Sequence, residues 1–352
     1  MKFSENERAA RESGEKCAVR LTESSFDGKL KRMYFQGINV QHPGGAGYKT
    51  MVRRYSGREK VRFWELDFVR GLCVLLMVFD HFMYCMWDVM PAVNSMLGTD
   101  FLAGMQKTGL WYWNWEVRNN VRVLVITAFF VLCGISCTLT RGNFRRSIPL
   151  LLVAWGITCV TSIVDNFIAG AKVQFGVIHM LGVSVLVYAI LDEAAQAVGS
   201  LLGTGKASRA VKEGLRYFPG IVGCIWLIWL FSGYAKIEDI NGYWMILPTF
   251  DAVGASSAQK DIYSILLYVK NYTFNSGDYF PILPWGAMVL VGGIIGRLVY
   301  HTSAKYAFKP LDGQWNKPLC FLGRHAAVIY VSHMVVIPAL LALCAWISSF
   351  FG

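Results

Sequence analysis

The sequence contains few charged residues for its length. Only 16% of its 352 residues are Asp, Glu, Lys or Arg, whereas 55% are hydrophobic. Soluble domains have about 25% charged and about 45–50% apolar residues. Apart from the first 61 residues, no long polar stretch is left to form a separate soluble domain. The composition therefore predicts an all-α fold, a polytopic transmembrane helix bundle.

The sequence also lacks the common short motifs of soluble enzymes. It has no Walker loop, no GxGxxG after a strand, no HExxH and no GxSxG, which argues against P-loop, dinucleotide-binding, zinc-peptidase and α/β-hydrolase chemistry. Eight of its nine cysteines lie in apolar runs, and none has zinc or redox spacing. We expect packing cysteines, no disulfide framework and no metal site.

Seven segments are long and apolar enough to cross a bilayer, which takes about 20 residues in a helix. An eighth or ninth span could lie within 89–120 or 241–275. The apolar run 241–250 alone is too short to cross a bilayer, and we expect it to be re-entrant or interfacial. The last span is long enough to tilt or break, and Pro338 could bend it. The seven expected spans are about 63–87, 121–140, 147–167, 174–191, 217–235, 281–300 and 320–349.

The positions of Lys and Arg predict the orientation. One set of alternate connections carries 16 of them and the other set carries 6, and the richer side faces the cytosol. The N-terminus is then cytosolic, the C-terminus is outside if there are seven spans, and the protein is a multi-pass protein of the inner (plasma) membrane. This topology accounts for the net charge of +11, so nucleic-acid binding is not expected.

Two regions follow from these patterns. Residues 1–61 are polar, basic and without a helical apolar period, and we expect a disordered cytosolic tail. Met51 is an alternative start, because a basic lead-in to the first span follows it. Residues 62–350 are expected to form one transmembrane domain in contact with the lipid bilayer.

The first span carries ionisable residues that are costly in lipid and usually face a bundle interior or a wet cavity. At 100° per residue, Asp67, Arg70 and His81 share one face of this helix, and His81 lies about 16 Å further along the axis than Arg70. An ion pair between Asp67 and Arg70 would lower the cost of burying both. A satisfied core histidine is the alternative for His81.

Four helix ends bring polar groups to the expected outer layer of the membrane. His81 ends the first span, Asp165 ends the third, His179 begins the fourth, and Asp278 precedes the sixth. Imidazole titrates near neutral pH and a carboxylate can fix its tautomer, so this set predicts a site for proton abstraction. Solvation of loop ends is the alternative for the two aspartates.

On the cytosolic side, Arg324 with Arg70 could form a basic vestibule suited to phosphates. Arg324 could equally be one more anchor on the positively charged side. His333 is expected about mid-membrane, and its direction opposes that of Arg324, so these residues cannot all line one cavity.

Four blocks of sequence resemble, in order, the bacterial proteins grouped with the catalytic domain of heparan-α-glucosaminide N-acetyltransferase. The resemblance runs from about 62 to 340, and the first block is also similar to the opening helix of integral-membrane O-acyltransferases. The chain is shorter than the lysosomal enzyme and we expect no luminal N-terminal domain, so an amino-sugar acceptor does not carry over. The blocks are ELDFVRGLCVLLMVFDHF, FGVIHMLGVSVLVY, DYFPILPWGAMVLVGGIIGR and FLGRHAAVIYVSH.

The resemblance implies a membrane acetyltransferase that takes acetyl-CoA as co-substrate from the cytosol and acetylates an amine or hydroxyl on the far face. We expect the acceptor to be a sugar, a glycan or another small molecule. His81 would be general base or acetyl carrier, with His179, Asp278 and Asp165 around it. The residues expected to bind the co-substrate are Arg70, Arg324, His325 and Trp285. Asn166 and the Trp285 indole are the candidate donors for a tetrahedral oxyanion.

Two other functions are compatible with buried charges in a helix bundle. A transporter of a small solute or of protons would use them as a relay, but it predicts repeats or broken helices in corresponding halves, and the chain shows no convincing repeat. A scaffold without chemistry leaves the buried histidines unexplained. Oligomeric state is left open, with a homodimer as one option.

Overall fold

The computed structural model divides the chain into Met1–Lys60 and Val61–Gly352, and everything below concerns the second unit. The expected tail over 1–61, with the alternative start at Met51, lies outside the described residues. These are residues 63–140, 142–166, 172–234, 236–240 and 243–350.

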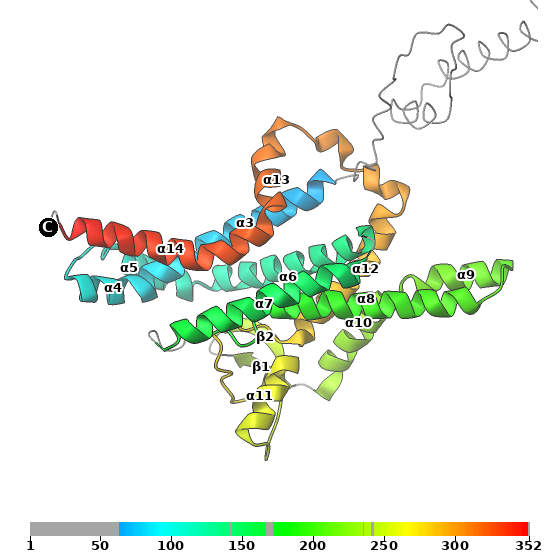
Figure 1. Ribbon diagram of the computed structural model, residues 1–352, viewed down its shortest axis with the longest axis horizontal. Coiled ribbons are helices and arrows are strands. Elements are labelled where there is room, and N and C mark those ends of the chain that lie inside the picture. Colours follow the sequence, from blue (N-terminus) through cyan, green and yellow to red (C-terminus); the bar gives the residue numbers. More distant parts are fainter. Residues whose placement is uncertain (1–62, 141, 167–171, 235, 241–242, 351–352) are drawn as a thin grey trace, which may run out of the picture. The chain divides into compact units, whose positions relative to one another are not determined.

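Long apolar helices make up most of the described chain (Figure 1). Six stretches are long and apolar enough to cross a membrane, and a seventh is a pair of helices bent by 52°. An all-α polytopic bundle with about seven spans is therefore confirmed. The six are the composite Trp64–Leu97, α6 (Glu116–Leu139), α7 (Asn143–Val164), α8 (Val177–Leu201), α12 (Ile282–Tyr300) and α14 (Ala326–Ser348); the bent pair is α9 (Lys206–Leu215) with α10 (Phe218–Trp229), which the π-helical turn η2 (Leu230–Tyr234) extends.

The first span is longer than expected, because the helix does not stop near residue 87. Helix α3 (Trp64–Tyr84) passes through a π-helical turn, η1 (Cys85–Val89), into α4 (Met90–Leu97). Gly98 ends α4 with φ of +67°, a backbone conformation that glycine adopts readily. The tryptophan-rich segment that follows forms the short helix α5 (Met105–Asn114).

The run over 241–250 was expected to be re-entrant or interfacial, and most of it is a strand. β1 (Lys236–Ile240) pairs antiparallel with β2 (Tyr243–Phe250), which pairs parallel with β3 (Tyr268–Val269). The sequence carried a signal for this hairpin, since an Asn-Gly pair lies between two strand-forming runs. Helix α11 (Ser257–Leu266) follows, begun by a capping box of Ser256 and Gln259.

The last expected span, 320–349, was long enough to tilt or break, and it is broken at His325, while Pro338 lies within α14. Helix α13 (Lys317–Arg324) ends at Arg324 and α14 begins at Ala326. Both lie alongside α3 (Figure 1). Three short 3₁₀ turns join α12 to α13: η3 (Ser303–Tyr306), η4 (Lys309–Leu311) and η5 (Gln314–Asn316).

Glycines let helix backbones touch at two crossings. A Cβ on Gly71 of α3 would collide with the Leu319 carbonyl of α13, and a Cβ on Gly323 would collide with the Asp67 carbonyl. Helices α6 and α12 meet in the same way at Gly134. Small residues of this kind allow close helix packing in membranes. The first crossing fixes the register of α13 and α14 against α3.

The principal hydrophobic core lies where α6, α8 and α12 meet. Its members pack around the indole of Trp285, which is 2% exposed. The ring of Phe130 lies edge-on to this indole at 5.6 Å between ring centres. This core supports the loop before α12 and the start of α8, and both contribute to the site below.

Candidate functional site

Two histidine rings from different helices meet inside the bundle. His81 of α3 and His333 of α14 lie edge to face, with ring centres 4.6 Å apart. His333 is 4% exposed and His81 is partly buried. The sequence interpretation placed His333 at mid-membrane and did not include it in the site.

The register of the last two helices explains this meeting. The Cys320 thiol lies 3.4 Å from the Trp64 carbonyl oxygen, and Gly323 packs on Asp67. Helix α13 therefore packs on the first turns of α3, and α14 continues beside α3 in the same direction (Figure 1). The sequence interpretation allowed for a break in the span from residue 320 but did not locate it, and it set His333 at mid-membrane and His81 close to the outer surface.

Both imidazoles are held in the same tautomer. His81 Nδ1 lies 2.9 Å from the Met77 carbonyl oxygen, and His333 Nδ1 lies 2.6 Å from that of Tyr330. A carbonyl oxygen only accepts, so each Nδ1 carries the proton, and each Nε2 holds a lone pair when the ring is neutral. His333 Nε2 is buried and has no hydrogen-bond partner among the described residues. Buried polar atoms are rarely left in this state, which makes this nitrogen a candidate for chemistry.

Asp278 lies beside this pair. Its Oδ2 accepts from the Val177 main-chain N–H at 2.9 Å and from the Tyr330 hydroxyl at 3.2 Å, which links the start of α8 to α14. Burial raises the pKa of Asp278, while these two hydrogen bonds and then the positive charges of His81 and Arg122 act in the opposite direction. This carboxyl group therefore lies within electrostatic range of His81.

The loop before α12 is fixed to the segment before α8. Phe175 and Tyr279 form a parallel bridge, and Ser276 Oγ accepts from the Gln174 N–H at 3.0 Å and donates to the Asp278 carbonyl at 2.5 Å. These contacts hold Asp278 where its side chain reaches the first N–H group of α8, a favourable position for a carboxylate.

His179, one of the expected site residues, is bonded within its own region. Its Nδ1 accepts from the Gly176 N–H at 3.3 Å, and its Nε2 lies 2.9 Å from Thr158 Oγ1 on α7. Both ring nitrogens are thus satisfied by structural partners, and the ring ties α7 to the start of α8.

Asp165 lies at the end of α7. Its Oδ1 accepts from the Lys172 N–H at 3.2 Å across the loop that leads to α8. The hydrogen bonds of His179 and the one from Lys172 to Asp165 lie within α7 and the segment that leads to α8. Both residues support the segment that carries Val177, and Val177 in turn binds Asp278.

Trp285 is part of the core wall. Its indole N–H donates to the Tyr268 hydroxyl at 2.9 Å, and burial raises the pKa of Tyr268 to about 12. The indole N–H is already used in this hydrogen bond, so Trp285 contributes packing to the wall of the site and no free donor.

Arg70 forms the ion pair that its spacing predicts. Its guanidinium lies 3.0 Å from Asp67 and also donates to the Ser136 hydroxyl of α6. Arg146, at the start of α7, lies within electrostatic range. This end of the bundle therefore carries two arginines close to each other, and the sequence interpretation had paired Arg70 with a different one.

Arg324 and His325 are exposed, at the junction of α13 and α14. Arg324 Nε donates to the Cys320 carbonyl at 3.2 Å, and His325 lies against the Phe321 ring at 4.4 Å between ring centres. Because Gly323 packs on Asp67, the backbone of Arg324 lies near Asp67, which forms the ion pair with Arg70.

An ion pair that the sequence interpretation did not recognise lies beside His81. Asp80 accepts from Arg118 Nε at 2.6 Å and from Arg118 Nη2 at 2.7 Å, and the Arg118 side chain is 2% exposed. The guanidinium also lies 3.9 Å from the centre of the Trp113 ring. The sequence interpretation had counted Arg118 as a loop charge; the aromatic residues before it and Asp80 on the first span were the available signals.

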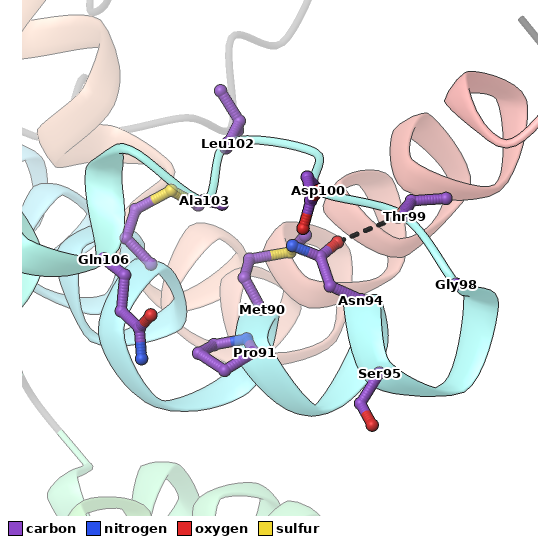
Figure 2. Close-up of a pocket in the computed structure, with 11 residues that line it drawn as sticks. Met90, Pro91, Asn94, Ser95, Gly98, Thr99, Asp100, Leu102, Ala103 and Gln106 are labelled. Carbon is purple, nitrogen blue, oxygen red and sulfur yellow. Dashed lines mark hydrogen bonds between the residues drawn. The ribbon is translucent and has the colours of Figure 1, made fainter. Parts of the chain in front are cut away.

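A pocket of about 380 Å³ lies at the far end of the first span, between α4 and α5 (Figure 2). Asn94, which lines the pocket, stabilises the loop between α4 and α5: its side chain accepts from the Thr99 hydroxyl at 3.0 Å and donates to the Phe101 carbonyl at 2.9 Å. His81 and His333 are not among its lining residues. Separately, no three His, Cys, Asp or Glu side chains of the described ranges are grouped to hold a metal ion.

Comparisons with known proteins agree with this architecture. The model of the family described as "Heparan-alpha-glucosaminide N-acetyltransferase, catalytic" matches residues 62–264 and 217–335. No curated protein and no solved structure matches the chain. The two matched segments together cover most of the chain, including every histidine and carboxylate of the site. The chain therefore belongs to the family of the heparan-α-glucosaminide N-acetyltransferase catalytic domain, a family of membrane acetyltransferases.

Proposed function

We propose that this protein transfers an acetyl group from acetyl-CoA, bound from the cytosol, to an amine or hydroxyl of an extracytoplasmic acceptor, a sugar or glycan above all. The observation that carries the proposal is the His81–His333–Asp278 cluster inside the helix bundle of an acetyltransferase family member. Acyl transfer needs a lone-pair base near the acceptor and a group that stabilises its conjugate acid, and this cluster has both.

His81 acts as the general base in this proposal. Its Nδ1–H is held by the Met77 carbonyl, which leaves Nε2 to take the proton from the acceptor. Asp278 stabilises the imidazolium that results, as a carboxylate does in other acyl-transfer sites.

The co-substrate lies along the axis of α3 in this proposal. CoA carries anionic phosphates at one end and the thioester at the other, and Arg70 and His81 are about 16 Å apart along the helix. Arg70 and its neighbour Arg146 supply positive charge at the phosphate end, although Asp67 already holds one side of the Arg70 guanidinium. The predicted excess of Lys and Arg on one side supports a cytosolic position for this end.

The decisive test is incubation of purified protein with labelled acetyl-CoA and extracted envelope glycans or lipids, followed by identification of what becomes labelled. The expected result is label in one glycan class with wild-type protein, and at least about 100-fold less with His81→Asn, the loss typical of a missing general base. Asn retains a donor for the Met77 carbonyl. Transfer by the variant at the wild-type rate would refute the role of His81.

A second measurement separates the enzyme from a carrier. CoA should raise the melting temperature of the detergent-solubilised protein, because a ligand that binds only the folded state stabilises it. Arg70→Gln should weaken this effect, while Lys206→Gln, an exposed residue at the start of α9, should leave it unchanged. An unchanged melting temperature at saturating CoA would contradict the co-substrate assignment.

A further inference from the structure

His333 has a feature that the proposed reaction does not yet use. Its ring is 4% exposed, its Nδ1–H is committed to the Tyr330 carbonyl, and its Nε2 is buried without a partner among the described residues. A buried polar atom left unsatisfied costs about 1–3 kcal/mol, so such an atom in a native fold calls for an explanation.

The two imidazoles have the same tautomer but different neighbours. His81 lies within electrostatic range of the Asp278 carboxylate, which suits a group that must become positively charged on taking a proton. His333 bonds to two main-chain carbonyls, those of Ile329 and Tyr330, and faces the His81 ring at 4.6 Å. A protonated His81 disfavours a second proton on His333, which therefore keeps its lone pair while His81 acts as base.

A desolvated lone pair on a neutral ring is a nucleophile, and burial shields an acyl-imidazole from water. We propose that His333 is the acyl carrier of the site, with Nε2 as the nucleophile, and that His81 is the base that deprotonates the acceptor. The inference rests on the proposed acetyltransferase function and divides its chemistry between two histidines.

His333 Nε2 attacks the thioester carbonyl carbon, the C–S bond breaks, and CoA leaves as thiolate from an N-acyl-imidazolium that retains its Nδ1–H. The acceptor oxygen or nitrogen then attacks the acyl carbon while its proton passes to His81 Nε2. The C–N bond breaks and its electron pair returns to His333 Nε2. His81 finally gives its proton to the thiolate, so that one thioester and one acceptor become one acetylated product and CoA thiol.

Isotope exchange without acceptor tests this division. Labelled CoA enters the acetyl-CoA pool only if the acyl group is held by the protein while CoA leaves and returns. At pH 9 most CoA thiol, with a pKa near that of cysteine (about 8.5), is already thiolate, so exchange then needs the nucleophile but no base.

Asn is the matched replacement at both positions, because its amide can still donate to the carbonyl that each Nδ1 binds, while the Nε2 lone pair is lost. We expect exchange at pH 9 in the wild type, at least about 100-fold less in His333→Asn, and loss within about 10-fold in His81→Asn. Transfer to the acceptor at pH 7 should fall at least about 100-fold in both variants. Melting temperatures measured in parallel show whether each variant is folded. If His333→Asn is not folded, His333→Gln replaces it, because glutamine also lacks a nucleophile.

Three results would overturn the inference, and they are distinguishable. Exchange lost in His81→Asn but kept in His333→Asn would make His81 the carrier. Acceptor labelling by the wild type without any exchange would establish direct transfer. Neither labelling nor exchange by folded wild-type protein would remove the acetyltransferase function itself, and the carrier with it.

Discussion

Removal of the Arg118 side chain should be among the most destabilising single changes in this protein. Arg118 binds both oxygens of Asp80 at 2.6 and 2.7 Å, is 2% exposed, and packs against the Trp113 ring. Breaking a buried ion pair by deleting one partner typically costs about 3–5 kcal/mol, because the other charge is left buried. A desolvated cation over an aromatic ring adds up to about 2 kcal/mol. Arg118→Ala should therefore lose about 3–5 kcal/mol or more.

Another ion pair in the same chain provides the control. Arg216 and Glu213 lie 2.9 Å apart, but their side chains are 57% and 63% exposed, and exposed pairs contribute about 0–1 kcal/mol. Denaturant or SDS titration of the purified protein in micelles should show a large loss for Arg118→Ala and almost none for Arg216→Ala.

A double-mutant cycle tests the cause of the loss. Asp80→Asn combined with Arg118→Ala should cost clearly less than the sum of the single changes, because the second change removes the charge that the first left unpaired. Equal losses for Arg118→Ala and Arg216→Ala, or strict additivity with Asp80→Asn, would refute the reasoning. The Asp80–Arg118 pair would then contribute no more to stability than a solvent-exposed ion pair.

Three further predictions concern other parts of the molecule. Gly323→Ala should lower both the melting temperature and the acetyl transfer rate, because a Cβ at this position collides with the backbone of α3. Gly214→Ala in α9 is the control, since a Cβ there meets open space and should change neither quantity. Equal effects of the two substitutions would contradict the close crossing. Asp278→Asn should keep an acceptor for the Val177 N–H but cut transfer by about 100-fold. Because burial raises the pKa of this carboxyl above 3.8, its contribution favours folding below pH 3.8 and is lost as pH rises through the folded value. The Asn variant should thus melt no lower than the wild type at pH 8, and a large drop there would show that the charge itself stabilises the fold. His179→Ala should cost about 1–3 kcal/mol of stability by leaving a buried N–H unsatisfied, with residual transfer per folded molecule close to wild type; its complete loss would return His179 to the chemistry.

Hydropathy and helical periodicity predicted the helix bundle and one of its ion pairs. The apolar runs were long enough to identify the spans, and the spacing of Asp67 and Arg70 predicted their ion pair. Periodicity also placed His81 on a polar face of α3. These features are local, because each depends on residues within one helix.

Features that depend on two helices were beyond that reasoning. The partner of Asp80 lies 38 residues away, and Arg118 had no local sign of burial apart from the aromatic residues before it. The strand over 243–250 was missed because only the length of the apolar run was used to judge it, although the Asn-Gly pair in the sequence before it favours a hairpin. Sequence alone therefore finds candidate charges more readily than it finds their partners.

The absence of His333 from the predicted site has the most consequence for mechanism. The depth of His333 was counted from residue 320, and a break in this long span was allowed for but not placed at His325. The break at His325 and the glycine contact between α3 and α13 set a different register, in which residues 320, 323 and 333 lie beside 64, 67 and 81. The two imidazoles meet because this register is fixed by backbone contact. Any substitution that separates α13 from α3 should therefore move His333 away from His81, and impair transfer without touching either ring.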